Sequence, residues 1–367
     1  MNIKTLLHTI EQHVPFTTAE SWDNVGLLIG DKQAKISGVL TALDCTIEVV
    51  DEAISKGLNT IICHHPLIFK GIKSVVEQDG YGAIIRKIIK HDINLIALHT
   101  NLDVYSDGVN KMLADKMNLT NLKPLNSADH YYYKVQVYVP QNNVESLKQN
   151  LSEHGLAEEG NYEYCFFESA GTGNFKPVDG ANPHQGKLHS IEQVAEVKLE
   201  FMINSSQKVL AQQLIEQYHP YETPVYDFVE MTKVANYGLG VIGELPATQN
   251  VSAFTASIKE NLNMPSVRYI GDLNAHIKKV AIIGGAGIGY EYQAQALGAD
   301  IFITGDIKHH EALDAKINQM NLLDINHYSE YVMKEGLINL LNNWLPVENI
   351  DFTMVASELN TDPYNYL

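Results

Sequence analysis

Two stretches near opposite ends of the chain share one pattern of apolar and polar residues, and this repeat constrains the fold more than any other feature. They read "GVLTALDCTIEVVDEAISKGLNTIICHHP" from residue 38 and "KVAIIGGAGIGYEYQAQALGADIFITGDIKHH" from residue 279. A gap-free alignment sets Gly57 opposite Gly298 and His65 opposite Asp306. Each copy reads as an apolar strand, a helix that ends at a glycine, and a second apolar strand. This is the pattern of a βαβ unit with parallel strands.

A third apolar run follows each copy, after a further predicted helix. The run "INLIALHTNLD" (residues 93–103) follows a helix expected around residues 81–91, and "NLLDINHYSE" (residues 321–330) follows one expected around residues 309–319. Because the order of elements matches as well as the residues, a duplication explains the two halves better than chance does. We therefore predict an α/β core domain of two related βαβ-containing halves.

The middle of the chain has a different character. "YYYKVQVYVPQNN" alternates as a strand does and "VESLKQNLSEHG" has helical spacing; "AEVKLEFMIN", "SQKVLAQQLIEQYHP" and "PVYDFVEM" then read as strand, helix and strand. This succession predicts a ferredoxin-like α+β domain, inserted into a discontinuous core. The glycine-rich "SAGTGNFKPVDGANPHQGK" reads as a mobile loop. The predicted parts are residues 1–125 and 238–367 for the two halves of the core, and residues 126–237 for the insertion.

The acidic composition bears on partners and location. Asp and Glu outnumber Lys and Arg by 44 to 26, and the net charge of −18 disfavours nucleic acid as a partner. The three cysteines form no CxxC pair, so neither a disulfide framework nor a thiolate zinc site is expected. No stretch is long and apolar enough to span a membrane, and "MNIKTLLHTIEQHV" lacks the apolar core of a signal peptide. We therefore expect a cytoplasmic protein with no membrane partner.

Polar side chains gather where the predicted strands end. They lie in the pair His64–His65 and in the runs "HTNLD" (residues 99–103), "TGDIKHH" (residues 304–310) and "NHYSE" (residues 326–330). In parallel α/β sheets, ligands bind outside the carboxyl ends of the strands, and a pseudo-twofold arrangement of the halves brings these four ends into one cleft. Adjacent side chains on an extended chain diverge, so His64 and His65 suit two different metal ions, with a bridging carboxylate to complete the pair.

Some of these features have plainer interpretations. Asp306 is equally well placed to cap the following helix. Trp22 and its neighbours Asp23 and Asn24 either line the cleft or form an ordinary buried tryptophan followed by a turn. "GGAGIGY" (residues 284–290) lacks the GK[ST] of a P-loop, so a tight turn near the cleft suits it better than a nucleotide-binding loop. Six histidines outside the pattern receive no role: His8, His13, His130, His184, His189 and His276.

The motifs together carry a family resemblance. "SWDNVGLLIG", "CHHPLIFKG", "HTNLD", "TGDIKHHEALDA" and "NHYSE" resemble the Nif-three-like family, also called GTP cyclohydrolase 1 type 2 homologues. "GTGNFKP" and "HPYE" in the insertion resemble the PII-like or CutA-like module of the longer bacterial members. The resemblance implies a two-metal site in each subunit and a toroidal homohexamer. Carried over by motif, the metal ligands are His64, His65, Asp103, His327 and Glu330.

Within that ligand set the resemblance makes Glu330 the bridging carboxylate. Three histidines and two carboxylates suit zinc, iron, manganese or nickel better than calcium or magnesium, and we expect two divalent ions per subunit, zinc first. His99 and Asp306 are the candidate catalytic or ligand-orienting groups. One departure from the family is Asn326, where many members have glycine; its amide either orients a water or a metal-bound histidine, or has no effect.

Two functions follow from these expectations. The first is a metal-dependent hydrolase that acts on a nucleotide-like or phosphorylated small molecule, because a pair of ions activates water and polarises a phosphoryl or carbonyl oxygen. No residue selects a guanine ring, so GTP cyclohydrolase activity remains only the family's label. The alternative is a non-catalytic, ring-forming metalloprotein with a regulatory or protein-interaction role, which the PII-like insertion favours. A site that keeps a position open for substrate would favour the enzyme.

Overall fold

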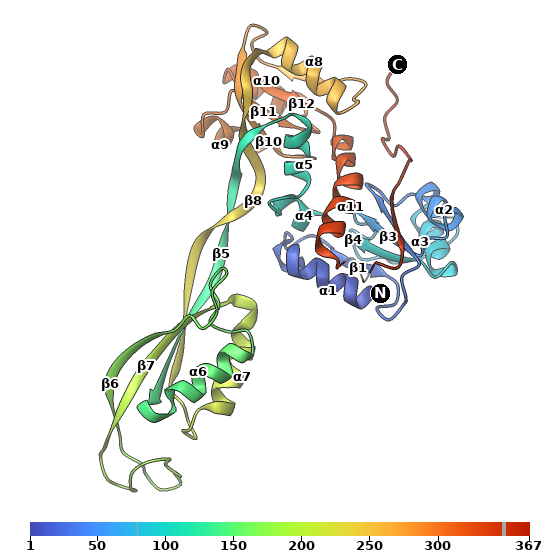
Figure 1. The fold of residues 1–367 in the computed structure, drawn as a ribbon. Helices are drawn as coiled ribbons and strands as arrows, with labels where there is room; N and C mark the ends of the chain where they lie inside the picture. Colours follow the sequence, from blue (N-terminus) through green and yellow to red (C-terminus); the bar gives the residue numbers. More distant parts are fainter. Residues whose placement is uncertain (79, 347–349) are drawn as a thin grey trace. The chain divides into compact units, whose positions relative to one another are not determined.

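The computed structural model describes residues 1–78, 80–346 and 350–367, without the side chains of residues 128–131, 233, 234 and 236, so His130 lies outside the described side chains. The chain forms two compact units (Figure 1). Unit 1 combines Met1–Ala128 with Asn236–Leu367, and unit 2 is Asp129–Ala235. Both contain helices and strands, which confirms the predicted mixed α/β class.

One sheet of unit 1 has five strands in the order β1-β4-β3-β2-β13; the first four come from the N-terminal half of the core and β13 comes from the C-terminal end of the chain. Strands β2, β3 and β4 are parallel, β13 is parallel to β2, and β1 runs antiparallel to β4. Every residue of the three central strands is buried, as expected for parallel strands covered on both faces. The bounds are α1 (Ile3–His13), β1 (Gly26–Ile29), β2 (Gly38–Ala42), α2 (Ile47–Ser55), β3 (Thr60–Cys63), α3 (Gly80–Lys90), β4 (Asn94–Ala97) and β13 (Thr353–Ala356).

The second half repeats this arrangement around strands β10, β11 and β12. These strands are parallel, and β9 runs antiparallel to β12 as β1 does to β4. The two halves differ at the other edge, where β8 is antiparallel to β10 but β13 is parallel to β2. The predicted βαβ units are therefore both present. The bounds are β8 (Tyr226–Asn250), α8 (Val251–Asn261), β9 (Arg268–Ile270), β10 (His276–Ile282), α9 (Glu291–Ala296), β11 (Ile301–Thr304), α10 (His309–Ile317) and β12 (Leu322–Asp324).

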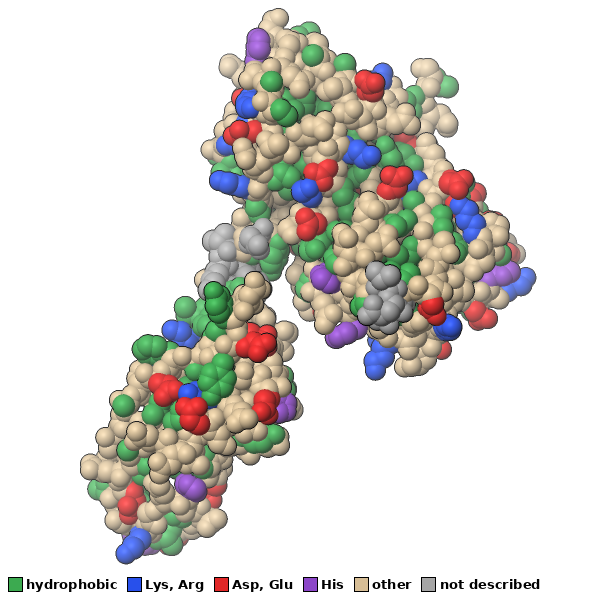
Figure 2. Space-filling view, viewed as in Figure 1, with side chains coloured by type: hydrophobic (Ala, Val, Ile, Leu, Met, Phe, Trp, Pro, Cys, Tyr) green, Lys and Arg blue, Asp and Glu red, His purple; other side chains and the backbone are tan. Residues whose placement is uncertain are grey.

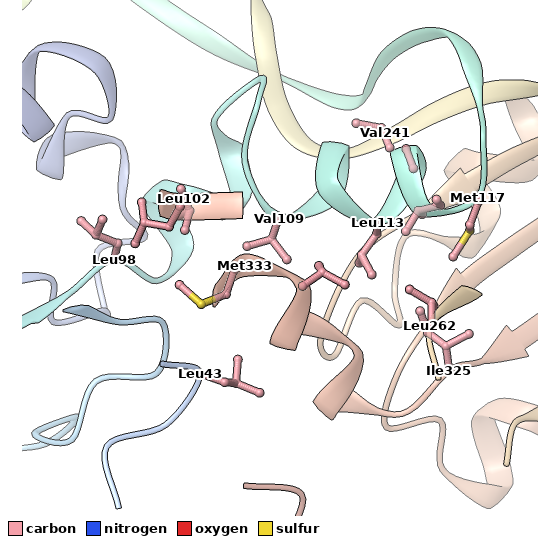
Figure 3. Packing of buried hydrophobic residues seen from close by; sticks show 14 of the residues in the cluster. Leu43, Leu98, Leu102, Val109, Leu113, Met117, Val241, Leu262, Ile325 and Met333 are labelled. Carbon is pink, nitrogen blue, oxygen red and sulfur yellow. The ribbon is translucent and has the colours of Figure 1, made fainter. Parts of the chain in front are cut away.

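One hydrophobic core joins the two halves. Helix α5 (Val109–Lys116) contacts β10, helix α11 (Met333–Trp344) contacts β2 and β13, and the two helices contact each other. Val109 of α5 lies close to Met333 at the start of α11 (Figure 3), and Val109, Leu113 and Met333 are all fully buried. The same cluster includes residues of both sheets, so the halves share a core rather than meeting at a polar interface.

Unit 2 has four strands in the order β6-β7-β5-β8, with helices α6 (Val144–Glu153) and α7 (Lys208–Tyr218). The prediction of a glycine-rich loop is partly wrong. Residues 167–175 form the strand β6 (Phe167–Phe175), and every residue of β6 pairs antiparallel with β7 (Glu192–Asn204). Since β6 is an edge strand with mostly exposed side chains, it lacks the apolar alternation that marks a strand in sequence. The fourth strand is β5 (Thr120–Pro140).

The surface carries charges of both signs. Acidic and basic side chains are interspersed on the face drawn in Figure 2, where Lys and Arg form no continuous patch. Within the described ranges no helix is both long enough and apolar enough to cross a bilayer.

Candidate metal centre

The strand ends of the two halves meet at one cluster of histidines and carboxylates in unit 1. His64 and His65 follow β3, and Asp103 lies on the short helix α4 (Thr100–Val104) that follows β4. From the other half, His327 and Glu330 lie on the 3₁₀ helix η4 (His327–Val332) that follows β12. The parallel topology therefore brings together all five residues that the sequence motifs single out as ligands.

Four histidine rings are held in the same way in this cluster. Each Nδ1 atom lies against an oxygen that can only accept, so Nδ1 carries a proton and Nε2 is the nitrogen that can bind a metal ion in place of a proton. The pairs are His64 with the carbonyl of Leu98 (2.8 Å), His65 with Asp44 (2.7 Å), His99 with Asp23 (2.9 Å) and His327 with Asp306 (2.7 Å). Anchoring of this kind fixes the ring and raises the basicity of the nitrogen that binds a metal.

Glu330 lies at the centre of the cluster. Its Oε2 atom is 3.1 Å from Nε2 of His65, 3.3 Å from Nε2 of His327 and 3.7 Å from Nε2 of His64. The residues that could hold a metal fall into three groups with closely spaced ligand atoms: His65 with His327 and Glu330, His64 with Asp103 and Glu330, and His64 with His65 and His99. Two of these groups share Glu330. A carboxylate that bridges two metal ions would be shared in this way.

Two buried polar atoms in the cluster have no hydrogen-bond partner among the described residues. They are Nε2 of His64 and Oδ1 of Asp103, which lie 3.5 Å apart. A buried polar atom without a partner costs about 1–3 kcal/mol. A divalent cation satisfies a nitrogen lone pair and a carboxylate oxygen at once, so the residues present fit a metal ion.

The carboxylates shift the ionisation of the histidines. Burial by itself lowers the pKa of His65, but hydrogen bonds to Asp44 and Glu330 outweigh it and raise the pKa to about 10. The pKa of His327 rises to about 9, because Glu330 and Asp306 outweigh burial in the same way. Conversely, although burial opposes it, the three surrounding histidines hold the pKa of Glu330 well below its usual value. Without a metal ion, protons on the histidines therefore balance the carboxylate charge.

The glycine turn of residues 284–290 packs directly against this carboxylate. A Cβ atom on Gly285 would lie 2.8 Å from Oε1 of Glu330 and 3.2 Å from Nε2 of His327. Gly285 also has a φ of +59°, which favours glycine. The helix that follows, α9, has only six residues. The turn therefore makes room for the carboxylate, in agreement with the tight-turn interpretation.

Asp306 does not cap the following helix. Helix α10 has Lys308 at its N-cap, and the Asp306 carboxylate instead accepts the hydrogen bond from Nδ1 of His327. Asn326 does not act on that histidine through its amide: Oδ1 accepts from the backbone N–H of Tyr328, and Nδ2 donates to Tyr366. Its φ of +67° explains why glycine suits this position and why asparagine is tolerated.

Trp22 is not a buried tryptophan. Its side chain is 56% exposed and lies edge-on to His99, with ring centroids 6.2 Å apart. A pocket of about 680 Å³ opens over the cluster, and His65, His99, Asp306 and His327 are among its lining residues. The cluster can therefore be reached from this pocket.

One residue that holds a histidine of the cluster was not predicted from the sequence, and two predicted histidines lie outside the cluster. Asp44, which holds His65, follows the end of β2 by two positions, so the strand-end rule could have found it. His309 and His310, at the end of the run "TGDIKHH", are exposed at the start of α10 and belong to none of the metal-binding groups found among the described residues.

The fold and the cluster define the class: a protein of two related α/β halves whose strand ends build one histidine–carboxylate centre. The chain matches the Duf34/NIF3 (NGG1p interacting factor 3) family over residues 1–363 and belongs to it, which confirms the predicted family.

Close relatives match this chain over its full length. The chain is 62% identical to the GTP cyclohydrolase 1 type 2 homolog of Staphylococcus aureus strain MRSA252, over 100% of both chains. Among solved structures, Staphylococcus aureus protein SA1388 is 57% identical with a TM-score of 0.87, over 100% of this chain and 99% of that one. A Bacillus cereus protein related to NIF3 is 36% identical with a TM-score of 0.85, over the same shares.

Replacing Gly285 by alanine is expected to weaken metal binding, because the new Cβ displaces the Glu330 carboxylate. Gly57→Ala is the matched control: Gly57 has a φ of +69°, similar to the +59° of Gly285, but a Cβ there meets no atom within 4 Å. The backbone strain is thus similar and only the clash differs. Metal content after dialysis against a weak chelator checks this. Equal metal content in the two variants would show that the glycine turn does not support the site.

Metal binding is expected to release protons and to strengthen as pH rises from 6 to 9. At pH 7 the metal-free protein carries protons on His65 and His327, whose pKa values are about 10 and about 9. A metal ion must displace both, so binding releases about two protons per chain. Isothermal titration calorimetry in buffers of different ionisation enthalpy measures this number. An affinity independent of pH across this range would contradict ligation by these histidines.

Proposed function

We propose that this protein binds two divalent metal ions per subunit and acts as a metal-dependent hydrolase on a nucleotide-like or phosphorylated small molecule. The observation that carries the proposal is the sharing of Glu330 by two ligand groups next to a pocket of about 680 Å³. A pocket of this size suits a small-molecule substrate.

We assign one ion to His64, Asp103 and Glu330, and the other to His65, His327 and Glu330. Zinc is the first choice for this donor set, with iron, manganese or nickel as alternatives. When bound, such a pair supplies an activated water and a Lewis acid for a phosphoryl or carbonyl oxygen.

The protein's own residues hold and orient this centre. Asp44 and Asp306 are positioning residues, because each fixes a histidine ring through Nδ1. His99 is our candidate acid/base group: it lines the pocket, and Asp23 holds the proton on its Nδ1. Thr100 also donates to the Asp23 carboxylate from its hydroxyl and from its backbone N–H, so the orientation of His99 is set by a connected network.

The alternative function, a non-catalytic ring-forming metalloprotein with a regulatory role, draws its support from unit 2. We propose that the insertion, residues 126–237, is a ferredoxin-like domain. The strands lie side by side in the order β6-β7-β5-β8, and along the chain α6 follows β5 and α7 follows β7; this arrangement supports the proposal. The toroidal homohexamer and the cytoplasmic location remain proposals from the family resemblance and the composition.

Replacement of the histidine pair is expected to abolish metal binding and hydrolysis together. The double variant His64→Ala, His65→Ala removes a ligand from each proposed ion. His309→Ala, His310→Ala is the matched control, because it removes an adjacent, exposed histidine pair outside the cluster. Metal content per chain and hydrolysis of a panel of nucleotides and phosphoesters are the measurements.

We expect close to two ions per chain and turnover in the wild type and in the control, and loss of both in the His64/His65 variant. Two ions without turnover on any member of the panel would reject the hydrolase and favour the regulatory metalloprotein. A metal-free wild type, purified without chelators, would reject both functions.

A further inference from the structure

We infer that the pocket over the histidine–carboxylate cluster binds a planar heteroaromatic ring, held against Phe69, whose own ring lies beside that of Trp22. The inference rests on the proposed function and refines it, because it names the substrate class: a small molecule in which such a ring, of nucleobase type, lies beside the group to be hydrolysed.

The first observation is an exposed tryptophan on a well-anchored segment. Trp22 is 56% exposed, yet the residues beside it are fixed on both sides. The Asp23 carboxylate binds His99 and Thr100, and the Asn24 amide donates to the carbonyl of Ile68. A flexible loop does not account for the exposure of Trp22, since these contacts hold its backbone in place.

The second observation is that three rings gather at the edge of the metal cluster. The ring centroids of Trp22 and Phe69 lie 5.7 Å apart, and that of His99 lies 6.2 Å from Trp22 and 6.5 Å from Phe69. Phe69 is itself 43% exposed. His99 belongs to one of the possible metal groups and lines the pocket with Phe69, so a ligand ring on Phe69 lies next to the histidine–carboxylate cluster.

The third observation is the chemistry of the pocket wall. Phe69, Tyr81, Tyr328 and Tyr364 contribute aromatic side chains to it, whereas none of the described residues that line it is Lys or Arg. The pocket therefore offers flat apolar surfaces for a ring and no side-chain ammonium or guanidinium for a phosphate. Any phosphoryl group must bind on the metal side, and the remaining affinity comes from stacking, which contributes about 1–3 kcal/mol per base.

Trp22 itself reports on ring binding. The chain has two tryptophans, and the second, Trp344, stacks on His13 with centroids 4.8 Å apart. In a Trp344→Phe variant all tryptophan fluorescence comes from Trp22. We expect saturable quenching by guanosine and adenosine, and none by ribose 5-phosphate, which has the sugar and phosphate without the ring. Equal responses to all three compounds, or none to the nucleosides, would overturn the inference.

A second variant tests Phe69 in the same background. Phe69→Leu is expected to weaken nucleoside binding about 5- to 150-fold, the effect of one lost stacking partner. The matched control is Phe167→Leu, which removes another exposed phenylalanine, on β6 of unit 2, and should leave binding unchanged. Unchanged binding in Phe69→Leu, or a change in its oligomeric mass that identifies Phe69 as a subunit contact, would overturn the inference.

The experiment separates this inference from the proposed function. The titration is run with the metal-loaded protein and after removal of metal with EDTA, alongside hydrolysis of nucleotides and of ring-free phosphoesters. Nucleoside binding that persists without metal supports the ring site even if nothing is hydrolysed. Hydrolysis of ring-free phosphoesters without any nucleoside binding would overturn the ring site and leave the hydrolase intact.

Discussion

One buried carboxylate oxygen, Oε2 of Glu330, is the point on which the two halves of the core converge. Three histidine nitrogens from both halves approach it, at 3.1, 3.3 and 3.7 Å. The other oxygen of the carboxylate lies against the glycine turn, where a Cβ would clash. A buried carboxylate requires compensating positive charge, so the arrangement of strand ends, turn and histidines is explained by the need to hold a cation or protons there.

The hydrophobic core provides the rigidity that such a centre needs. Helices α5 and α11 pack between the halves, and their buried residues fix the distance between the strand ends of the two sheets. Asp44, Asp23 and Asp306 then fix the individual rings through Nδ1. Ligand positions are therefore set by packing first and by hydrogen bonds second, as binding sites on rigid elements generally are.

Much of this could be predicted from the sequence, because it depends on local patterns. The repeat, with its paired Gly57 and Gly298, predicts the parallel strands, and the polar residues that follow those strands predict the histidine–carboxylate cluster. Features that depend on contacts between residues far apart in the sequence could not be predicted. The exposure of Trp22 is one of them, because it depends on which distant residues cover its side chain. Strand β6 has no alternation because both its faces are largely exposed, and the partner of Asp306 is on another strand end.

The most direct test of the account is anomalous diffraction from crystals of the protein purified with its native metal. We predict two anomalous peaks in each subunit, one beside His64 and Asp103 and the other beside His65 and His327, with Glu330 between them. A single peak, or peaks that do not contact Glu330, would contradict the claim that this carboxylate joins two metal sites.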